Sequence, residues 1–135
     1  MNLDTLAATE VMGWPVIDTL APVPKGGYVR LQCAYFGSDH PDRCGIFQPS
    51  TNIAHAHMLR DKVLEKHPEW RVVSVASRHT FPEKGMWFYA DVKDVTGRFI
   101  SESGTHSTEP AALCLALLRA TGVPEDQIKE AMDGK

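Results

Sequence analysis

Three runs of sequence between Pro49 and Gly122 organise this chain: PSTNIAHAHMLRDKVLEKHPEWRVVSVAS (residues 49–77), MWFYADVKDVTGRFISES (residues 86–103) and THSTEPAALCLALLRATG (residues 105–122). Apolar residues first recur every three or four positions, then alternate with other residues, and finally return to the helical spacing. This order predicts a helix, three strands and a helix. We therefore expect an α-β-β-β-α core at residues 49–122.

The first helix of this core is expected between Pro49 and Pro68. Pro49 cannot donate to a strand ladder, and Ser50 has an oxygen that can accept from the first amides of a helix, so we predict Ser50 as the N-cap. Pro68 ends the helix because the residue before a proline disfavours helical geometry. The buried side is predicted as a stripe of four residues: Ile53, Ala56, Leu59 and Val63.

The sheet is predicted from runs rich in β-branched and aromatic residues at 70–77, 86–92 and 98–103. In the second strand, alternation places four residues on one face, which we assign to the core: Met86, Phe88, Ala90 and Val92. Trp87 and Tyr89 point to the other face. Because both are large aromatics, we expect that face to be partly covered by the N-terminal segment or by a partner.

The last helix of the core has clear start and stop signals. Thr108 is its expected N-cap, Pro110 lies in its first turn, and Gly122 stands where a left-handed residue ends a helix. Residues 111–118 are apolar around most of the helix circumference, so a single contact face cannot account for them. We predict burial within the domain, with a homodimer contact as the alternative.

Outside this core we predict a helix at residues 3–12, an insertion at 18–45 and a short C-terminal helix at 124–133. The insertion is expected to be a strand or hairpin laid on an edge of the sheet, with an exposed tip. The 135 residues, 43% of them hydrophobic, suit a single domain at 1–135 with one core. The predicted class is α+β, with helices packed on a three- to four-stranded antiparallel sheet.

Composition argues against several classes of protein. The formal net charge is −3, from 14 basic and 17 acidic residues, so the chain lacks the basic excess of a nucleic-acid binder. No apolar run approaches the roughly 20 residues that span a bilayer, and we expect no export signal, because the first residues lack a basic region followed by a hydrophobic core. Three cysteines are too few for a disulfide framework, so we expect reduced thiols in a cytoplasm.

The predicted element order also occurs in the double-stranded RNA-binding domain, which holds phosphates with a basic cluster at the start of its last helix. The corresponding residues here, Thr105-His106-Ser107-Thr108-Glu109-Pro110, include a glutamate and no lysine. We therefore expect no nucleic-acid binding through this surface.

Cys33, His40 and Cys44 come nearest to a metal-binding pattern, because thiolates and imidazoles are zinc ligands. Their spacing matches no zinc motif. His55 and His57 lie about 200° apart around a helix and cannot share an ion. We predict no metal and no cofactor, and we expect both helix histidines to be solvated.

Catalytic motifs are also missing from the sequence. It contains no glycine-rich phosphate loop, no serine elbow and no histidine pair with an intervening glutamate. Cys44 has Arg43 beside it and His40 four residues away, and nearby positive charge lowers a thiol pKa, but proximity in sequence is weak evidence. We predict that the protein is not an enzyme.

Three segments carry a resemblance to a known family: Val11-Met12-Gly13-Trp14, Pro49-Ser50-Thr51-Asn52-Ile53-Ala54-His55-Ala56, and Thr108-Glu109-Pro110-Ala111-Ala112-Leu113-Cys114. Their pattern of cap, glycine stop and apolar helix resembles the phage ABA-sandwich domain family, which consists of small bacteriophage and prophage proteins. The resemblance implies a phage-derived protein in the cytoplasm of a bacterial host, in a family without an established activity.

By analogy with other small phage proteins, we expect a non-enzymatic accessory protein that binds and inhibits a host protein or complex. The sharpest form of this hypothesis is an anti-defence role, such as blocking a CRISPR effector. The predicted contact surface combines aromatic anchors with a charged loop: Tyr35, Phe36, Asp39, His40, Asp42 and Arg43. Two alternatives stay open. One is a small-ligand or metal-binding protein that uses a pocket near Cys33, His40 and Cys44, and the other is a homodimeric structural phage protein.

Overall fold

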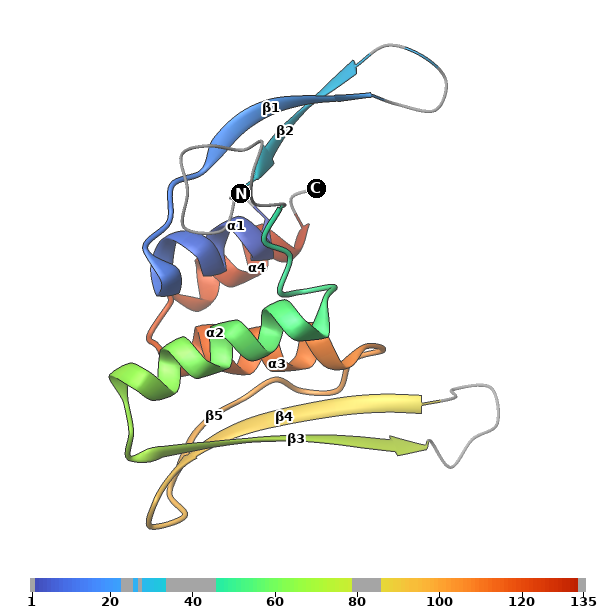
Figure 1. The fold of residues 1–135 in the computed structure, drawn as a ribbon. Coiled ribbons are helices and arrows are strands. Elements are labelled where there is room, and N and C mark those ends of the chain that lie inside the picture. Colours follow the sequence, from blue (N-terminus) through green and yellow to red (C-terminus); the bar gives the residue numbers. More distant parts are fainter. Residues whose placement is uncertain (1, 23–25, 27, 34–45, 79–85, 134–135) are drawn as a thin grey trace.

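The computed structural model describes residues 2–22, 26, 28–33, 46–78 and 86–133. Its elements are α1 (Leu3–Ala7), the π-helical turn η1 (Ala8–Met12), β1 (Ile17–Pro22), β2 (Tyr28–Cys33), α2 (Ile53–Lys66), β3 (Trp70–Arg78), β4 (Met86–Asp94), β5 (Phe99–Glu102), α3 (Glu109–Ala120) and α4 (Glu125–Asp133). They form layers (Figure 1): the β1–β2 hairpin, then α1 with α4, then α2 with α3, and finally the sheet of β3, β4 and β5. The predicted α+β class and the α-β-β-β-α order are confirmed.

The main sheet is antiparallel, and its strand order is β3–β4–β5. All nine residues of β3 pair with β4 in an unbroken register, from Trp70 opposite Asp94 to Arg78 opposite Met86. The pairing of β4 with β5 is shorter and carries a register shift between Val92 and Lys93. The sheet therefore has one long, regular edge strand, β3, and one short, irregular edge strand, β5.

Helix α3 forms the centre of the core. Its residues from Ala112 to Leu118 are all buried, because α3 packs on the sheet with one side and on α1, α2 and α4 with the other. In β5, the buried Ser101 Oγ donates to the carbonyl oxygen of Ala116 at 2.7 Å and so ties the sheet to the helix. The prediction that this apolar helix is buried within the domain is confirmed.

The start of α2 corrects the predicted cap. Oδ1 of Asn52, rather than Ser50, accepts from the amides of Ala54 and His55 at 2.9 and 3.3 Å. The amide of Ser50 donates instead to Oδ1 of Asp4 at 2.8 Å, which joins this turn to α1. Serine, threonine and asparagine can all cap a helix, so the local sequence leaves the choice to the turn that precedes α2.

The buried stripe of α2 is also shorter than predicted. Ala56, Leu59 and Val63 are fully buried, but Ile53 is 36% exposed. Ile53 is the first residue of the helix, and the contact with the core begins one turn later.

The boundaries of α3 agree with the sequence signals except in one bond. Thr108 has the extended backbone of an N-cap and Pro110 lies in the first turn, but the Thr108 side chain makes no capping hydrogen bond. Gly122 adopts φ 87°, the left-handed conformation that glycine accepts without a Cβ penalty. The chain can therefore turn directly from α3 towards α4.

The side chain of Arg119 fixes the turn between α3 and α4 through hydrogen bonds. The Arg119 guanidinium donates to both carboxylate oxygens of Glu125 at 3.1 and 2.9 Å, and its Nη1 donates to the carbonyl oxygens of Glu102 and Ser103 at 3.1 and 2.9 Å. Arg119 thereby links α3, the start of α4 and the end of β5. The planar guanidinium is suited to this role because its donors have a fixed fork geometry.

The insertion at 18–45 does not lie where we predicted. Its described part is an antiparallel hairpin in which Ile17 pairs with Cys33 and Pro22 with Tyr28. This hairpin forms a separate two-stranded sheet beyond α1 and α4, on the far side of the helices from the main sheet (Figure 1). Only four residues, Gly13 to Val16, lead into β1, and they span at most about 14 Å. Packed helices are about 8–10 Å apart, and two helical layers lie between β1 and the main sheet (Figure 1). The link is therefore too short to carry β1 to an edge of that sheet.

Candidate functional site

The side of the main sheet that points away from α3 is here called the outer face. Side chains alternate along a strand, and Ala90 and Val92 are buried towards α3, so the odd-numbered residues of β3 and β4 lie on the opposite side. The described residues of the outer face are Arg71, Val73, Val75, Trp87, Tyr89, Asp91, Lys93, Phe99 and Glu102.

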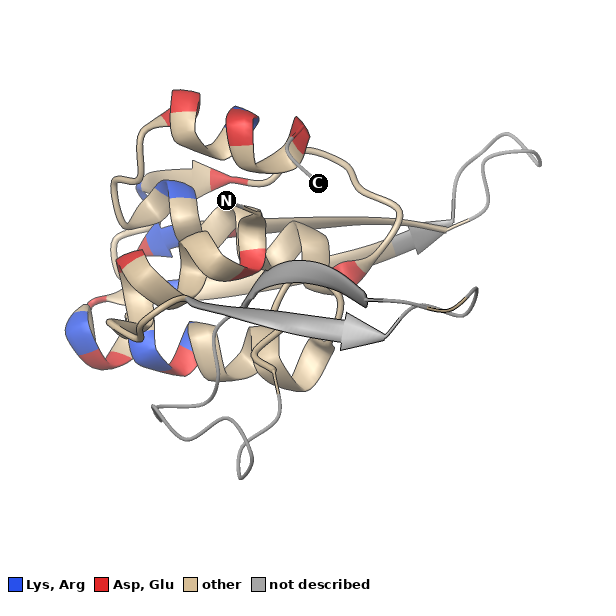
Figure 2. Cartoon of the chain, turned by 90° about the horizontal axis from the view of Figure 1, so that it is seen from above, with Lys and Arg blue, Asp and Glu red and all other residues tan. Residues whose placement is uncertain are grey.

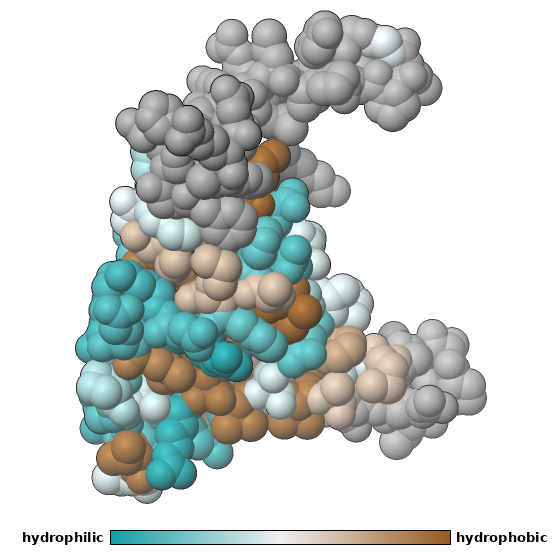
Figure 3. All heavy atoms as spheres, viewed as in Figure 1, coloured by the Kyte–Doolittle hydropathy of each residue, from teal (hydrophilic) through white to brown (hydrophobic). Residues whose placement is uncertain are grey.

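Apolar side chains are exposed next to one another on this face. On β3, Val73 is 48% exposed and Val75 is 44% exposed; Phe99, which is 48% exposed, lies apart from them on β5, opposite Lys93. Val75 lies opposite Tyr89 on β4, so β3 and β4 share an aliphatic and aromatic strip. Figure 3 shows brown, apolar residues along β3 and β4, in contrast to the teal residues of α2 above them. Single exposed valines are common, but neighbouring ones on a regular strand indicate a contact surface.

Two carboxylates lie beside this strip. Asp91 and Glu102 are directly opposite each other on β4 and β5, where like charges repel. Among the described residues, neither carboxylate forms an ion pair with a lysine or arginine. Within that same set, Oδ1 of Asp91 is shielded from water and has no hydrogen-bond partner. The centre of the outer face is therefore negative, and no cation of the described residues compensates it.

Tyr89 connects the apolar strip to this acidic pair. Its hydroxyl donates to Oε2 of Glu102 at 2.7 Å. Partial burial and the hydrogen bond to Glu102 raise the pKa of Tyr89 to about 12. The hydroxyl therefore keeps its proton at neutral pH and holds the Glu102 carboxylate beside Asp91.

The end of the outer face near the β4–β5 turn has the opposite charge. Arg71 lies opposite Lys93, and Nζ of Lys93 is 5.6 Å from the ring centroid of Phe99. A cation over an aromatic face is attracted by the ring quadrupole. The outer face thus has a basic end, an acidic centre and an apolar strip.

The structure corrects the prediction that the N-terminal segment covers this face. Helix α1 packs with α4 and α3 on the other side of the helical layers, and Val73 and Val75 remain about half exposed. The sequence signal for this exposed face is the alternation of Val73 and Val75 with the smaller Ser74 and Ala76. Cover by a partner stays a prediction.

The predicted contact residues Tyr35, Phe36, Asp39, His40, Asp42 and Arg43 lie outside the described residues. The same holds for His40 and Cys44 of the possible metal site, and of Cys33 only the backbone in β2 is described. Within the described part of the chain, no three His, Cys, Asp or Glu side chains come close enough together to hold a metal ion.

His55 corrects the prediction that both helix histidines are solvated. Its Nδ1 accepts from the amide of Gln48 at 2.9 Å, and its ring stacks on Phe47 with centroids 5.7 Å apart. Burial lowers the pKa of His55, so the ring is neutral at pH 7. The thiol of Cys114 is fully buried in α3, and burial raises its pKa. Both side chains therefore contribute to the packing of the domain.

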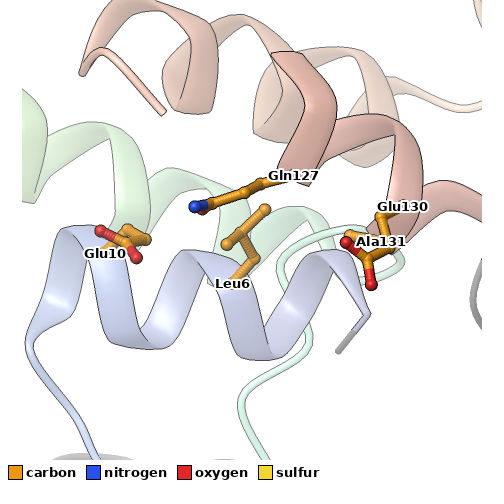
Figure 4. A pocket seen from close by; sticks show the side chains of 5 residues that line it. All are labelled: Leu6, Glu10, Gln127, Glu130 and Ala131. Atoms are coloured by element: carbon orange, nitrogen blue, oxygen red, sulfur yellow. The ribbon is translucent and has the colours of Figure 1, made fainter. Parts of the chain in front are cut away.

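A hollow of about 330 Å³ lies between α1 and α4 (Figure 4). It is lined by Leu6, Glu10, Gln127, Glu130 and Ala131. Figure 4 shows the two carboxylates at opposite ends of the hollow, so they do not converge on one ligand. The geometry thus offers neither paired acids for catalysis nor a common cation site.

The charges elsewhere on the surface are mixed. Figure 2 shows acidic residues along α4 and residues of both signs on α2. On α2, Arg60 bonds to its neighbour Asp61 at 3.1 Å. Phosphate binding favours a cluster of one sign, so neither helix resembles a nucleic-acid surface.

Comparison of the chain with known protein families, curated proteins and solved structures found no match. Among the described residues, no helix has the length and apolar character needed to cross a bilayer.

Proposed function

We propose that this chain is a non-enzymatic binding protein that contacts another protein through the outer face of the β3–β4–β5 sheet. The observation that carries this proposal is the exposure of Val73 and Val75 on the regular strand β3, beside an acidic pair that no described lysine or arginine neutralises. Interfaces of this kind bury apolar anchors and use charges at their sides to orient the partner.

The chemistry of the face supports one class of partner. Asp91 and Glu102 repel each other until a cation is placed between them, so the partner should present a lysine or arginine there. Val73, Val75 and Tyr89 lie next to this position and require an apolar side chain beside the basic one. The partner is therefore a protein surface with a basic residue adjacent to an apolar residue.

The resemblance to the phage ABA-sandwich family suggests that this partner is a protein of the bacterial host. In a phage context the target is a host protein or complex, and binding inhibits it. An anti-defence target, such as a CRISPR effector, is the most specific form of this proposal. It is supported by analogy with other small phage proteins and by the binding chemistry of the outer face.

A matched pair of valine substitutions tests the surface. The Val75→Glu variant places a charge in the apolar strip, whereas Val95→Glu makes the same change at a 58% exposed residue in the turn after β4, beyond the end of that strip. Tagged wild-type protein should capture a specific host protein from bacterial lysate. Val95→Glu should capture it equally, and Val75→Glu should lose it.

The capture experiment also separates the outer face from the loop that the sequence favours. A D39K/D42K variant should retain the partner if the outer face is the interface. If D39K/D42K lost the partner and Val75→Glu retained it, the interface would be the loop and not the outer face. Hydrogen exchange of the purified complex should show protection in β3 and β4, and unchanged exchange there would refute the proposal.

A further inference from the structure

The outer edge of β3 is the second unusual feature of the sheet. No described strand pairs with that edge, although β3 is nine residues long and its register with β4 is unbroken. Proteins usually protect such edges with proline, a bulge, a central charge or a short strand. The run Val72-Val-Ser-Val-Ala-Ser77 has none of these devices, and its only charged neighbours are Arg71 and Arg78.

We propose that β3 pairs with β3 of a second copy of this chain, antiparallel and centred on Ser74. This pairing would join the two sheets into one six-stranded sheet. It goes beyond the binding function proposed above and does not depend on it, because it requires only this chain.

The hydrogen bonds of β4 show which groups point to the open edge. Phe88 exchanges both of its backbone bonds with His106 at 2.8 and 2.9 Å, and the Ala90 carbonyl accepts from the Ser103 amide at 2.9 Å. The even-numbered residues of β4 therefore point away from β3. In an antiparallel pair the direction alternates, so the odd-numbered residues of β4 carry the bonds to β3.

The register of β3 with β4 shows in which direction the backbone groups of β3 point. Val73 and Val75 lie opposite Asp91 and Tyr89, so their backbone groups bond to β4. The backbone groups of Val72, Ser74 and Ala76 then point to the open edge. Three successive sets of donors and acceptors are thus available along one straight strand, which is about 30 Å long.

A two-fold axis at Ser74 uses all three sets. Ser74 lies opposite its own copy, Val72 lies opposite Ala76 and Ala76 opposite Val72, each in a hydrogen-bonded pair. Two bonds for each of these three pairs make about six in total. A two-fold axis perpendicular to the sheet also keeps the outer faces of both copies on the same side, so Val73 of one copy lies opposite Val75 of the other. Valine pairs of this kind stabilise a sheet.

Charge supports the same register. With the axis at Ser74, Arg71 lies opposite Ser77 and Arg78 lies opposite Trp70, so no like charges are opposed. A shift that placed Arg71 on the axis would oppose two arginines and would leave most of the strand unpaired. The strand is therefore self-complementary in the centred register, which is the requirement for a closed two-fold interface.

The dimer would also change the binding surface proposed above. Two outer faces would become one continuous face, with the four valines from β3 and β3 of the second copy at its centre and an acidic pair on each side. A partner could then contact both copies, which raises affinity without any new type of contact.

The first test removes an edge donor and keeps the side-chain volume small. Proline at position 76 has no N–H, and because this N–H points to the open edge, the Ala76→Pro change spares the bonds between β3 and β4. The matched control is Ala76→Val, which keeps the N–H and favours a strand.

Sedimentation velocity over a wide concentration range should show a monomer–dimer equilibrium for the wild type and for Ala76→Val. Ala76→Pro should raise the dissociation constant at least about tenfold, since it removes two of about six bonds and blocks close approach. Far-ultraviolet circular dichroism would establish that this variant is folded. A wild type that remains monomeric at all concentrations, or a folded Ala76→Pro that dimerises as well as the wild type, would overturn the proposal.

Cross-linking tests the register independently of Ala76→Pro. Ser74→Cys should form an intermolecular disulfide on mild oxidation, because opposed residues of a hydrogen-bonded pair have Cα atoms about 5.5 Å apart, within the range for a disulfide. Thr96→Cys, at an exposed turn position far from the edge, is the control and should not cross-link. Cross-linking at Thr96→Cys, or none at Ser74→Cys, would contradict an axis at Ser74.

Discussion

The double substitution Val73→Thr and Val75→Thr tests whether the outer face is open in the folded monomer. Threonine keeps the β-branched shape that suits a strand, and it replaces one methyl group by a hydroxyl group. The core substitution Leu117→Ala serves as the comparison, because Leu117 is fully buried in α3.

The expected costs follow from burial. Full burial of a valine contributes about 1.5–3 kcal/mol, but Val73 and Val75 are already 48% and 44% exposed. A hydroxyl group on this face remains hydrated, so each change should lower the free energy of unfolding by about 1 kcal/mol or less. Leu117→Ala removes buried methyl groups and leaves a cavity, and it should cost about 2–5 kcal/mol.

Urea denaturation followed by circular dichroism measures these differences, provided that the protein is dilute enough to be monomeric. The slope of the free energy against urea should stay the same in all variants, which indicates an unchanged unfolding reaction. If the double threonine variant lost as much stability as Leu117→Ala, the outer face would be buried in the monomer. The proposal of an open binding surface would then fail.

Three further predictions concern single groups. Tyr89 should titrate near pH 12 in an absorbance difference between the wild type and Tyr89→Phe, and Glu102→Gln should shift this midpoint down towards 10, because the accepting carboxylate is lost. Since burial lowers the pKa of His55 in the folded state, the unfolded chain binds more protons below about pH 6.5. Stability should therefore fall as the pH drops through that range. Thermal denaturation should show a smaller fall in the His55→Asn variant than in the wild type. An equal fall in both would mean that groups other than His55 cause the pH dependence. Cys114 should be unreactive towards an alkylating reagent in the native protein and reactive in concentrated urea, as peptide mapping by mass spectrometry would show. Rapid native modification would mean that α3 is not packed as described.

The elements that were predicted correctly have local causes. The spacing of apolar residues along α2 and the left-handed glycine at Gly122 are properties of neighbouring residues, and both are found in the structure. The burial of α3 was also foreseeable, because an all-round apolar helix must be covered on more than one side.

The errors have non-local causes. Ser50 and Asn52 are equally good caps by local rules, and the contact of Ser50 with Asp4, 46 residues away, goes with the choice of Asn52. The position of the β1–β2 hairpin depends on the reach of a four-residue link across two helical layers. The candidate site could not be chosen from the sequence for the same reason, since Asp91 and Glu102 become neighbours only through strand pairing.

Periodicity, caps and turn residues were therefore sufficient to predict the class of fold and the order of its helices and strands, because each of these signals acts within a few residues. The packing of the folded chain determines which sheet face carries α3, which face stays exposed and which edge of β3 has no described strand beside it. Those outcomes depend on contacts between segments that are distant in sequence, such as Ser101 with Ala116 and Tyr89 with Glu102. The pattern of neighbouring residues does not predict such contacts, because they form only when whole layers pack against each other.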